Sequence, residues 1–311
     1  MTLAEDYAAL RGAAGARLAR RDGLRVTGPD AASYLQGQCS QDVEALSVGD
    51  TAEALLLSPQ GKLEAYVRVT RTAPDGFLLD VDEGFGGAVL ERLQRFRLRV
   101  KAELDPVALE CLSARGPGAA DAVAAVAAEV WAPFSWGPAV GVDLLAPSVD
   151  PSAADVRWSG VAAWEALRVE AGIPVMGAEL DEQTIAAEAG LLERTVSFTK
   201  GCYTGQELVA RLDARGNRVA RHLRGLVSDA GPGTVPAAAD APAPWPAGTE
   251  VVDPAGGKVV GTVTSSAWSP TLGAVALAYL HRSLSPPAAV ELRLPGGAAA
   301  GAEARPLPLV S

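Results

Sequence analysis

Residues 53–71 read EALLLSPQGKLEAYVRVTR, two apolar runs separated by a short polar turn. The runs over 53–58 and 63–71 have the composition of strands, and PQG at 59–61 is typical of a hairpin turn. Antiparallel hairpins occur where helices and strands are mixed rather than wound in repeating parallel units. This stretch therefore favours an α+β fold over a doubly wound sheet.

Helical and strand-like patterns are mixed on both sides of the hairpin. They predict, in chain order, a helix over 5–20, a strand over 24–28, a helix from Asp30 to Leu35, a strand over 77–82 and a helix over 85–96. FRLRVKAEL at 96–104 alternates strictly, which predicts another strand with Arg97, Arg99 and Lys101 on one face. That face is either solvated or available to an anionic ligand.

The C-terminal part has a different composition. Residues 228–248 are dominated by Ala, Pro and Gly, which predicts a loop or linker. Short strands are predicted beyond it, over 250–252, 258–266, 274–280 and 289–294. Their length and spacing predict a small β-barrel or sandwich. We therefore expect two domains, an α+β body over 1–225 and a C-terminal β-barrel over 226–311.

Composition excludes several classes of function. The 311 residues carry a formal net charge of −10, which disfavours a general nucleic-acid binder. The three cysteines lie far apart, and two histidines are too few for a histidine metal cage. The N-terminus has acids where a signal peptide has bases, and no run has the length of a membrane span. The sequence thus predicts a cytoplasmic protein with neither a metal site nor a membrane segment.

One cysteine stands in a distinctive stretch, KGCYTGQE at 200–207. Thr204 and Glu207 have the spacing of a capping box, which predicts a helix from about 205 to 214. Cys202 would then lie just before a helix N-terminus, where free amides and the helix dipole favour an anion.

Lys200 would add a positive charge beside the same sulfur, and both effects favour a thiolate. Gly201 and Gly205 leave room for a ligand to approach the backbone. The alternative is a small buried cysteine, which is common in proteins of this kind and which we expect for Cys111. Cys39 lies in a polar turn, and its environment is less certain.

A second candidate is Glu170, in the last turn of a helix predicted over 161–171. The helix dipole opposes a carboxylate at this end by roughly 0.3–1 kcal/mol, so a compensating partner is expected. Arg168 is one such partner. A ligand is the other, because a carboxylate matches two adjacent N–H groups such as those of a pterin edge.

With these residues in view, the chain resembles the folate-binding YgfZ family, relatives of the aminomethyltransferase (T-protein) of the glycine cleavage system. KGCYTGQE matches the family signature, and four weaker matches occur in the family's order: YLQGQCSQDV (34–43), SPQGK (58–62), LRVEAGIP (167–174) and GTVTSS (261–266). The resemblance implies a GcvT-like body around a folate site, followed by a β-barrel. It also implies that Glu170 holds the pterin and that Cys202 is the key cysteine.

These arguments give a set of candidate residues. The candidate folate-binding residues are Glu170, Arg168, Gln38, Tyr203, Arg97 and Arg99. The candidate catalytic residues are Cys202 and Lys200, within a motif that includes Gly201, Gly205, Gln206 and Glu207.

Three functions remain open at this point. The first is a tetrahydrofolate-binding accessory protein for iron–sulfur enzymes, including tRNA-modifying ones, with iron–sulfur client or assembly proteins as partners. The second is a folate-dependent one-carbon (aminomethyl) transferase. In T-proteins the hairpin that corresponds to residues 59–66 carries paired aspartates used in one-carbon transfer. This chain has GKLEAY there, with Glu64 as the nearest carboxylate, which argues against transfer. The third is a plain folate-binding module in which Cys202 is structural.

Overall fold

The structure is a computed structural model that describes residues 2–236 and 242–311. The strands are β1 Gly15–Thr27, β2 Thr51–Leu57, β3 Leu63–Ala73, β4 Gly76–Asp82, β5 Glu103–Arg115, β6 Val130–Trp136, β7 Ala139–Ala146, β8 Arg157–Trp158, β9 Arg221–Ser228, β10 Glu250–Asp253, β11 Lys258–Ser269, β12 Gly273–His281, β13 Ala288–Arg293 and β14 Ala299–Arg305. The α-helices are α1 Leu3–Gly12, α2 Ala31–Gln38, α3 Gly86–Phe96, α4 Ala119–Ala122, α5 Val161–Ala171, α6 Leu192–Thr195 and α7 Gln206–Asp213. Short 3-10 turns lie at Pro151–Ala153 and Pro232–Thr234.

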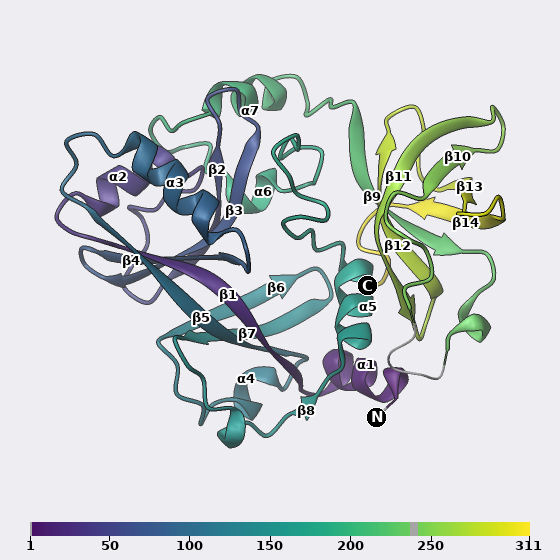
Figure 1. The fold of residues 1–311 in the computed structure, drawn as a ribbon, viewed down its shortest axis with the longest axis horizontal. Helices are drawn as coiled ribbons and strands as arrows, with labels where there is room; N and C mark the ends of the chain where they lie inside the picture. The colour runs from purple at the N-terminus through teal and green to yellow at the C-terminus, as the bar shows by residue number, and fades with distance from the viewer. Residues whose placement is uncertain (1, 237–241) are drawn as a thin grey trace.

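The predicted hairpin is confirmed as β2 and β3, which pair antiparallel from Thr51↔Thr70 to Leu57↔Leu63. They begin a sheet in the order β2-β3-β4-β1-β5-β7-β6, with β8 added beside β1. All neighbours in the main path are antiparallel, so the α+β class is confirmed. The long strands β1 and β5 cross the centre of this sheet in Figure 1.

The predicted helix over 5–20 is only half correct. α1 covers Leu3–Gly12 and begins with a capping box between Thr2 and Glu5. The chain then turns into β1, whose register runs from Gly15↔Arg115 to Thr27↔Glu103. Pairing with β4 and β5 on both sides outweighs the helical propensity of the alanines, because a central strand gains two ladders of hydrogen bonds.

The predicted strand over 96–104 is wrong. α3 continues to Phe96, β5 begins only at Glu103, and Arg99 between them has a φ of 58°. Phe96 packs against the guanidinium of Arg92, 4.1 Å from its ring centre, and Lys101 N–H donates to Asp30. These contacts fix a tight loop. The alternation of apolar and polar residues over 96–104 therefore comes from a loop with inward and outward side chains, not from a strand.

The C-terminal unit is a closed barrel in the order β10-β11-β12-β9-β14-β13. The predicted strands over 250–252, 258–266, 274–280 and 289–294 are confirmed as β10 to β13. The sequence patterns predict neither β9 nor β14. Because β9 starts at Arg221, the predicted boundary at 225/226 falls inside a barrel strand. Residues 237–241, which belong to the predicted linker over 228–248, lie outside the described residues.

Helix α5 lies between the sheet and the barrel, as Figure 1 shows, and it packs against α1, β11 and β12. Its predicted bounds, 161–171, are confirmed, and Gly172 ends it at a φ of 76°. The side chains of α5 therefore fall into two groups. One group faces the sheet, and the other faces α1 and the barrel.

Candidate functional site

A cavity of about 400 Å³ lies between the sheet and α5. Its floor is made by side chains of β1, β3, β4, β5 and β7, and α5 with the segment after it forms one wall. The residues that line it include Arg17, Arg21, Glu53, Tyr66, Arg68, Asp82, Glu83, Cys111, Ser113, Arg115, Phe134, Trp136, Asp143, Trp164, Glu165 and Arg168. A volume of this size is typical of sites for small organic ligands.

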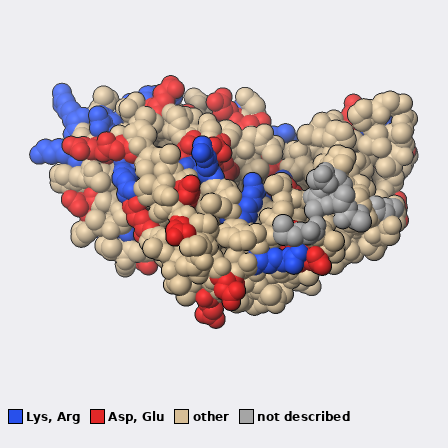
Figure 2. All heavy atoms as spheres, turned by 60° about the horizontal axis from the view of Figure 1, so that its bottom comes forward, with Lys and Arg blue, Asp and Glu red and all other residues tan. Residues whose placement is uncertain are grey.

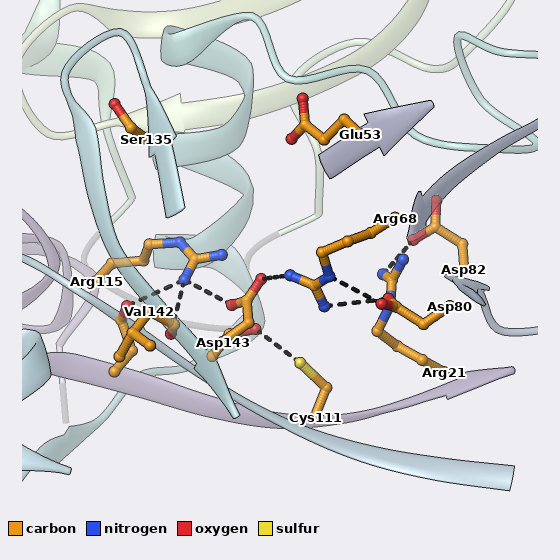
Figure 3. Close-up of polar contacts among 12 residues, drawn as sticks. Arg21, Glu53, Arg68, Asp80, Asp82, Cys111, Arg115, Ser135, Val142 and Asp143 are labelled. Carbon is orange, nitrogen blue, oxygen red and sulfur yellow. Dashed lines mark hydrogen bonds and ion pairs between the residues drawn. The ribbon is translucent and has the colours of Figure 1, made fainter. Parts of the chain in front are cut away.

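A chain of alternating charges crosses the floor of the cavity (Figure 3). It runs Asp82–Arg21–Asp80–Arg68–Asp143–Arg115, with N···O distances of 2.7, 2.5, 2.8, 2.9 and 2.7 Å. We call these six residues the ion ladder. Five strands contribute to it, so the sheet register sets the spacing of its charges.

The members of the ladder hold one another in the charged state. Burial alone would raise the pKa of Asp143, but Arg115 and Arg68 outweigh burial and keep its pKa well below the ordinary range. Burial would likewise lower the pKa of Arg68, and Asp80 with Asp143 reverses this effect. The ladder is therefore a neutralised polar surface with its charges fixed in place.

Aromatic rings complete the cavity beside the ladder. Arg115 lies 3.6 Å from the ring centre of Phe134 and 5.1 Å from that of Trp164. Tyr66 stands on the floor, and burial raises its pKa well above the ordinary value, so it is a neutral phenol. Such flat apolar faces next to fixed polar groups suit a flat heteroaromatic ligand.

Cys111 also lines the cavity, 3.4 Å from the hydroxyl of Ser113. Burial raises the pKa of its thiol to about 11, so it is protonated at neutral pH. The sequence-based expectation of a buried, inert cysteine is consistent with this environment. Cys39 is also buried, with its pKa raised to about 12 by burial.

Arg168 connects the cavity to the barrel. Its guanidinium lies 2.8 Å from Glu165 and 3.1 Å from Glu179. Glu179 is fully buried and accepts hydrogen bonds from Thr264 and Ser265 of β11, at 2.8 and 2.6 Å. The two hydroxyls belong to the GTVTSS stretch. This motif of the barrel therefore contacts Glu179, which in turn pairs with Arg168 in the cavity wall.

The predicted residues do not form one site. Arg168 lines the cavity, whereas Glu170 lies on the opposite side of α5, where it is fully buried. The hydroxyl of Tyr7 donates to Glu170 at 2.5 Å, and burial raises the pKa of this carboxyl. Arg168 pairs with Glu165 and Glu179, so it does not neutralise Glu170 as one alternative had it.

Three other candidate folate-binding residues also lie away from the cavity lining. Gln38 accepts a hydrogen bond from Arg92 at 2.9 Å. Arg97 and Arg99 are exposed in the loop after α3, and the Arg97 guanidinium donates to the carbonyl of Ala102. Since 97–102 is a loop, the predicted basic strand face that would meet the folate tail does not exist.

The KGCYTGQE stretch is attached to α2 by Lys200. The ammonium of Lys200 donates to the carbonyls of Gln36, Cys39 and Gln41 at 2.7, 2.8 and 2.8 Å. These carbonyls lie at and beyond the C-terminal end of α2, where the helix dipole favours a cation. Burial lowers the pKa of Lys200. The three bonds give this lysine a structural task that sequence reasoning missed.

The predicted capping box is also wrong. α7 begins at Gln206, its N-cap is Gly205, and the amide of Thr204 donates instead to the carbonyl of Gly37. Gly205 has a φ of 84°, and a Cβ there would lie 2.5 Å from the carbonyl oxygen of Ser58. The glycine therefore permits α7 to pack against the turn of the β2–β3 hairpin.

Cys202 is exposed, and it does not line the cavity. Its neighbour Tyr203 is half-buried over Lys200, whose ammonium lies 5.3 Å from the ring centre, and burial raises the pKa of Tyr203 to about 12. Glu64 is likewise outside the cavity lining, and it pairs with Arg92. The structure thus shows two separate features, a charged cavity and an exposed thiol.

Sequence reasoning missed Asp143 and Arg115, two buried members of the ladder. Asp143 stands inside the apolar run VGVDLLA, and an isolated acid in such a run is a signal of a buried partner.

The charged groups elsewhere are mixed in sign. On the face in Figure 2, blue and red side chains are interspersed among mostly tan ones. Within the described residues, no helix is long and apolar enough to cross a membrane.

Comparison with known proteins supports one family. Residues 3–138 match the GCVT N-terminal domain, and residues 233–310 match the glycine cleavage T-protein C-terminal barrel domain. The chain is 31% identical to the tRNA-modifying protein YgfZ of Edwardsiella ictaluri, over 65% of this chain and 68% of that protein. The chain belongs to the YgfZ/GcvT family of folate-binding proteins.

Two further relatives show the breadth of the YgfZ/GcvT family. An aminomethyltransferase of Corynebacterium jeikeium is 27% identical over 90% of this chain and 82% of its own length. The crystal structure of the glycine cleavage system aminomethyltransferase T from Bartonella henselae has a TM-score of 0.79 and 21% identity, covering 99% of this chain and 89% of its own. This structural likeness confirms the predicted fold, a GcvT-like body followed by a β-barrel.

Proposed function

We propose that this protein binds tetrahydrofolate in the cavity and serves as an accessory protein for iron–sulfur enzymes, including ones that modify tRNA. The observation that carries the proposal is the ion ladder. It makes the floor of the cavity polar and rigid, yet it leaves none of its own carboxylates without an arginine. Such a floor is suited to hold a ligand rather than to exchange protons with it.

The residues of the cavity fit a folate. A pterin presents N–H donors and ring acceptors at one edge, and carboxylates and guanidiniums are the groups that pair with them. Asp82, Glu165 and Arg168 offer such groups at the lining, and Phe134 and Trp164 offer aromatic faces. These residues would hold the pterin, and bound tetrahydrofolate would supply one-carbon or reducing chemistry.

Cys202 supplies the second part of the proposal. It is exposed on a loop that Lys200 fastens to α2, so the sulfur is held at a defined place where another protein can reach it. The relatives named tRNA-modifying proteins support a role in that process. A single thiol cannot hold a cluster alone, so a cluster contact requires a partner protein.

Two measurements test the proposal. Tetrahydrofolate should bind the purified protein with saturable affinity in a calorimetric titration. In cells that lack their own copy, the wild-type chain should restore iron–sulfur-dependent tRNA modification, whereas Cys202→Ala and Cys202→Ser should bind tetrahydrofolate normally and fail to restore it. Full restoration by the serine variant would show that the sulfur is not required.

The alternative is an aminomethyltransferase, which the near full-length similarity to the Corynebacterium protein favours. The cavity gives it few acid–base groups. Glu64 is outside the lining, and Glu53 and Glu165 are paired with arginines. Glu83 also lines the cavity, but its side chain is exposed to water rather than enclosed with the ligand. An assay for transfer of an aminomethyl carbon to tetrahydrofolate separates the two functions. Turnover would establish the transferase and replace the accessory role.

A further inference from the structure

Arg17 lines the cavity and is half-buried, yet within residues 2–236 and 242–311 no carboxylate pairs with it and no hydrogen bond holds its guanidinium. In the same part of the chain Arg20 also lines the cavity without such a partner, but its side chain is exposed to water. Arg21, Arg68, Arg115 and Arg168, by contrast, each pair with at least one acid. A partly desolvated guanidinium without an anion is unfavourable, so this position is suited to an anion from outside the chain.

The strand register places this side chain on the cavity floor. Arg17 lies opposite Ser113, and Ala19 lies opposite Cys111, and both β5 residues line the cavity. Side chains alternate along a strand, so Arg17, Ala19 and Arg21 share one face of β1. Arg20, which lies opposite Glu110, also lines the cavity, but it is exposed. Arg17 is separated from Arg21 by four residues, about 13 Å along β1. A ligand that covers the ladder can therefore also reach Arg17 if it is elongated.

We infer that Arg17 binds a carboxylate of the ligand, and that the cavity selects pterin compounds with a glutamyl tail over those without one. This inference rests on the proposed function. A planar guanidinium binds a carboxylate through two parallel hydrogen bonds, and the glutamyl group is the part of a folate that carries carboxylates. Arg17 takes the place that the sequence assigned to Arg97 and Arg99, which lie outside the cavity lining.

The test compares two ligands that differ only in the tail. Tetrahydrofolate and tetrahydropteroate share the pterin and the aminobenzoyl ring, but tetrahydropteroate lacks the glutamyl group. Both are titrated against the wild-type protein, Arg17→Gln and Arg215→Gln, with thermal melting to verify folding. Arg215 is the control, since it is an exposed arginine outside the cavity lining.

The wild-type protein should prefer tetrahydrofolate by about tenfold or more, the scale of a hydrogen bond to a charged group. Arg17→Gln should bind tetrahydropteroate as the wild type does and lose the preference, and Arg215→Gln should keep it. A preference that survives in a folded Arg17→Gln protein overturns the inference alone. If the wild type binds neither ligand, the proposed folate site fails and the inference fails with it.

Discussion

At the scale of single residues, Asp143 is the carboxylate on which two buried guanidiniums depend. Its side chain is 10% exposed and lies between Arg68, 13% exposed, and Arg115, 5% exposed. Removing one partner of a buried ion pair leaves the other charge without compensation, which typically costs roughly 3–5 kcal/mol. The floor of the cavity therefore depends on this one acid for its shape.

The change Asp143→Asn should lower the free energy of unfolding by about 3–5 kcal/mol, because it leaves the buried Arg115 facing a neutral amide and Arg68 paired with Asp80 alone. Urea unfolding followed by circular dichroism measures this loss. Glu129→Gln is the control, since Glu129 pairs with Arg25 at a more exposed site and should cost at most about 1 kcal/mol. Equal losses for the two variants would contradict the role given to the ladder.

Glu170 gives a prediction with a sign in pH. Burial raises its pKa above the ordinary 4.5, so above that pH the folded protein binds more protons than the unfolded chain. Stability contributed by Glu170 is therefore present below about pH 4.5 and is lost as pH rises through the raised pKa.

Glu170→Gln removes this titration and keeps a side chain of the same shape. At pH 7 the variant should be more stable than the wild type by about 1 kcal/mol, and the difference should shrink as the pH is lowered to 4.5. Thermal melts over pH 4.5–8 give both quantities. A variant that is destabilised equally at all pH values would show that the carboxylate is not penalised by burial.

The residue scale also shows where sequence reasoning failed and why. Arg168 and Glu170 are two positions apart on a helix, about 200° around its axis, so both cannot face one cavity. Motif similarity placed them together, and helix geometry separates them. Asp143 was detectable as an acid in an apolar run, but its partners come from β3 and β5, and no local pattern could identify them.

At the scale of elements, Lys200 joins the cysteine loop to α2. Its ammonium satisfies three carbonyls that would otherwise lack protein donors at a helix end. The hairpin β2–β3 approaches the same loop from the other side, where Gly61 allows contact with Leu208. Cys202 is thus held by packing between two elements rather than by a capped helix.

Lys200→Met should release this loop without unfolding the body. We expect hydrogen exchange at residues 36–41 and 200–204 to become faster, with a loss of roughly 1.5–3 kcal/mol in local stability. Lys62→Met is the control, because the ammonium of Lys62 donates to the side chain of Gln183 at an exposed site. Protection that stays unchanged in Lys200→Met would show that other contacts hold the loop.

The bounds of helices and strands were predicted well where one hydrophobic period dominates the local sequence. They were predicted poorly where tertiary contacts determine the secondary structure. The hairpin β2–β3, helix α5 and four barrel strands carry clear local patterns, and all are confirmed. The alanines of 13–20 and the alternating stretch 96–104 carry patterns too. Pairing of β1 with two strands decides the first, and the loop anchored by Asp30 decides the second.

At the scale of the whole molecule, the barrel is joined to the cavity wall through one buried acid. Glu179 pairs with Arg168 on one side and accepts the hydroxyls of Thr264 and Ser265 on the other. The backbone carbonyl of Glu179 also accepts the hydroxyl of Tyr279. The position of Arg168 in the cavity therefore depends on the docking of β11 and β12 against the body.

Glu179→Gln should weaken both the domain contact and the cavity. Arg168 is 8% exposed, so loss of the fully buried charge of Glu179 should lower the free energy of unfolding by about 3–5 kcal/mol. Tetrahydrofolate should also bind more weakly, because a less firmly held guanidinium loses more freedom on binding. Calorimetric titration and thermal melting measure the two effects.

Glu182→Gln is the control, since Glu182 is an exposed acid of the same segment, and it should change neither the stability nor the affinity. A Glu179→Gln protein that melts earlier but binds tetrahydrofolate as tightly as the wild type would show that the barrel stabilises the body without shaping the cavity.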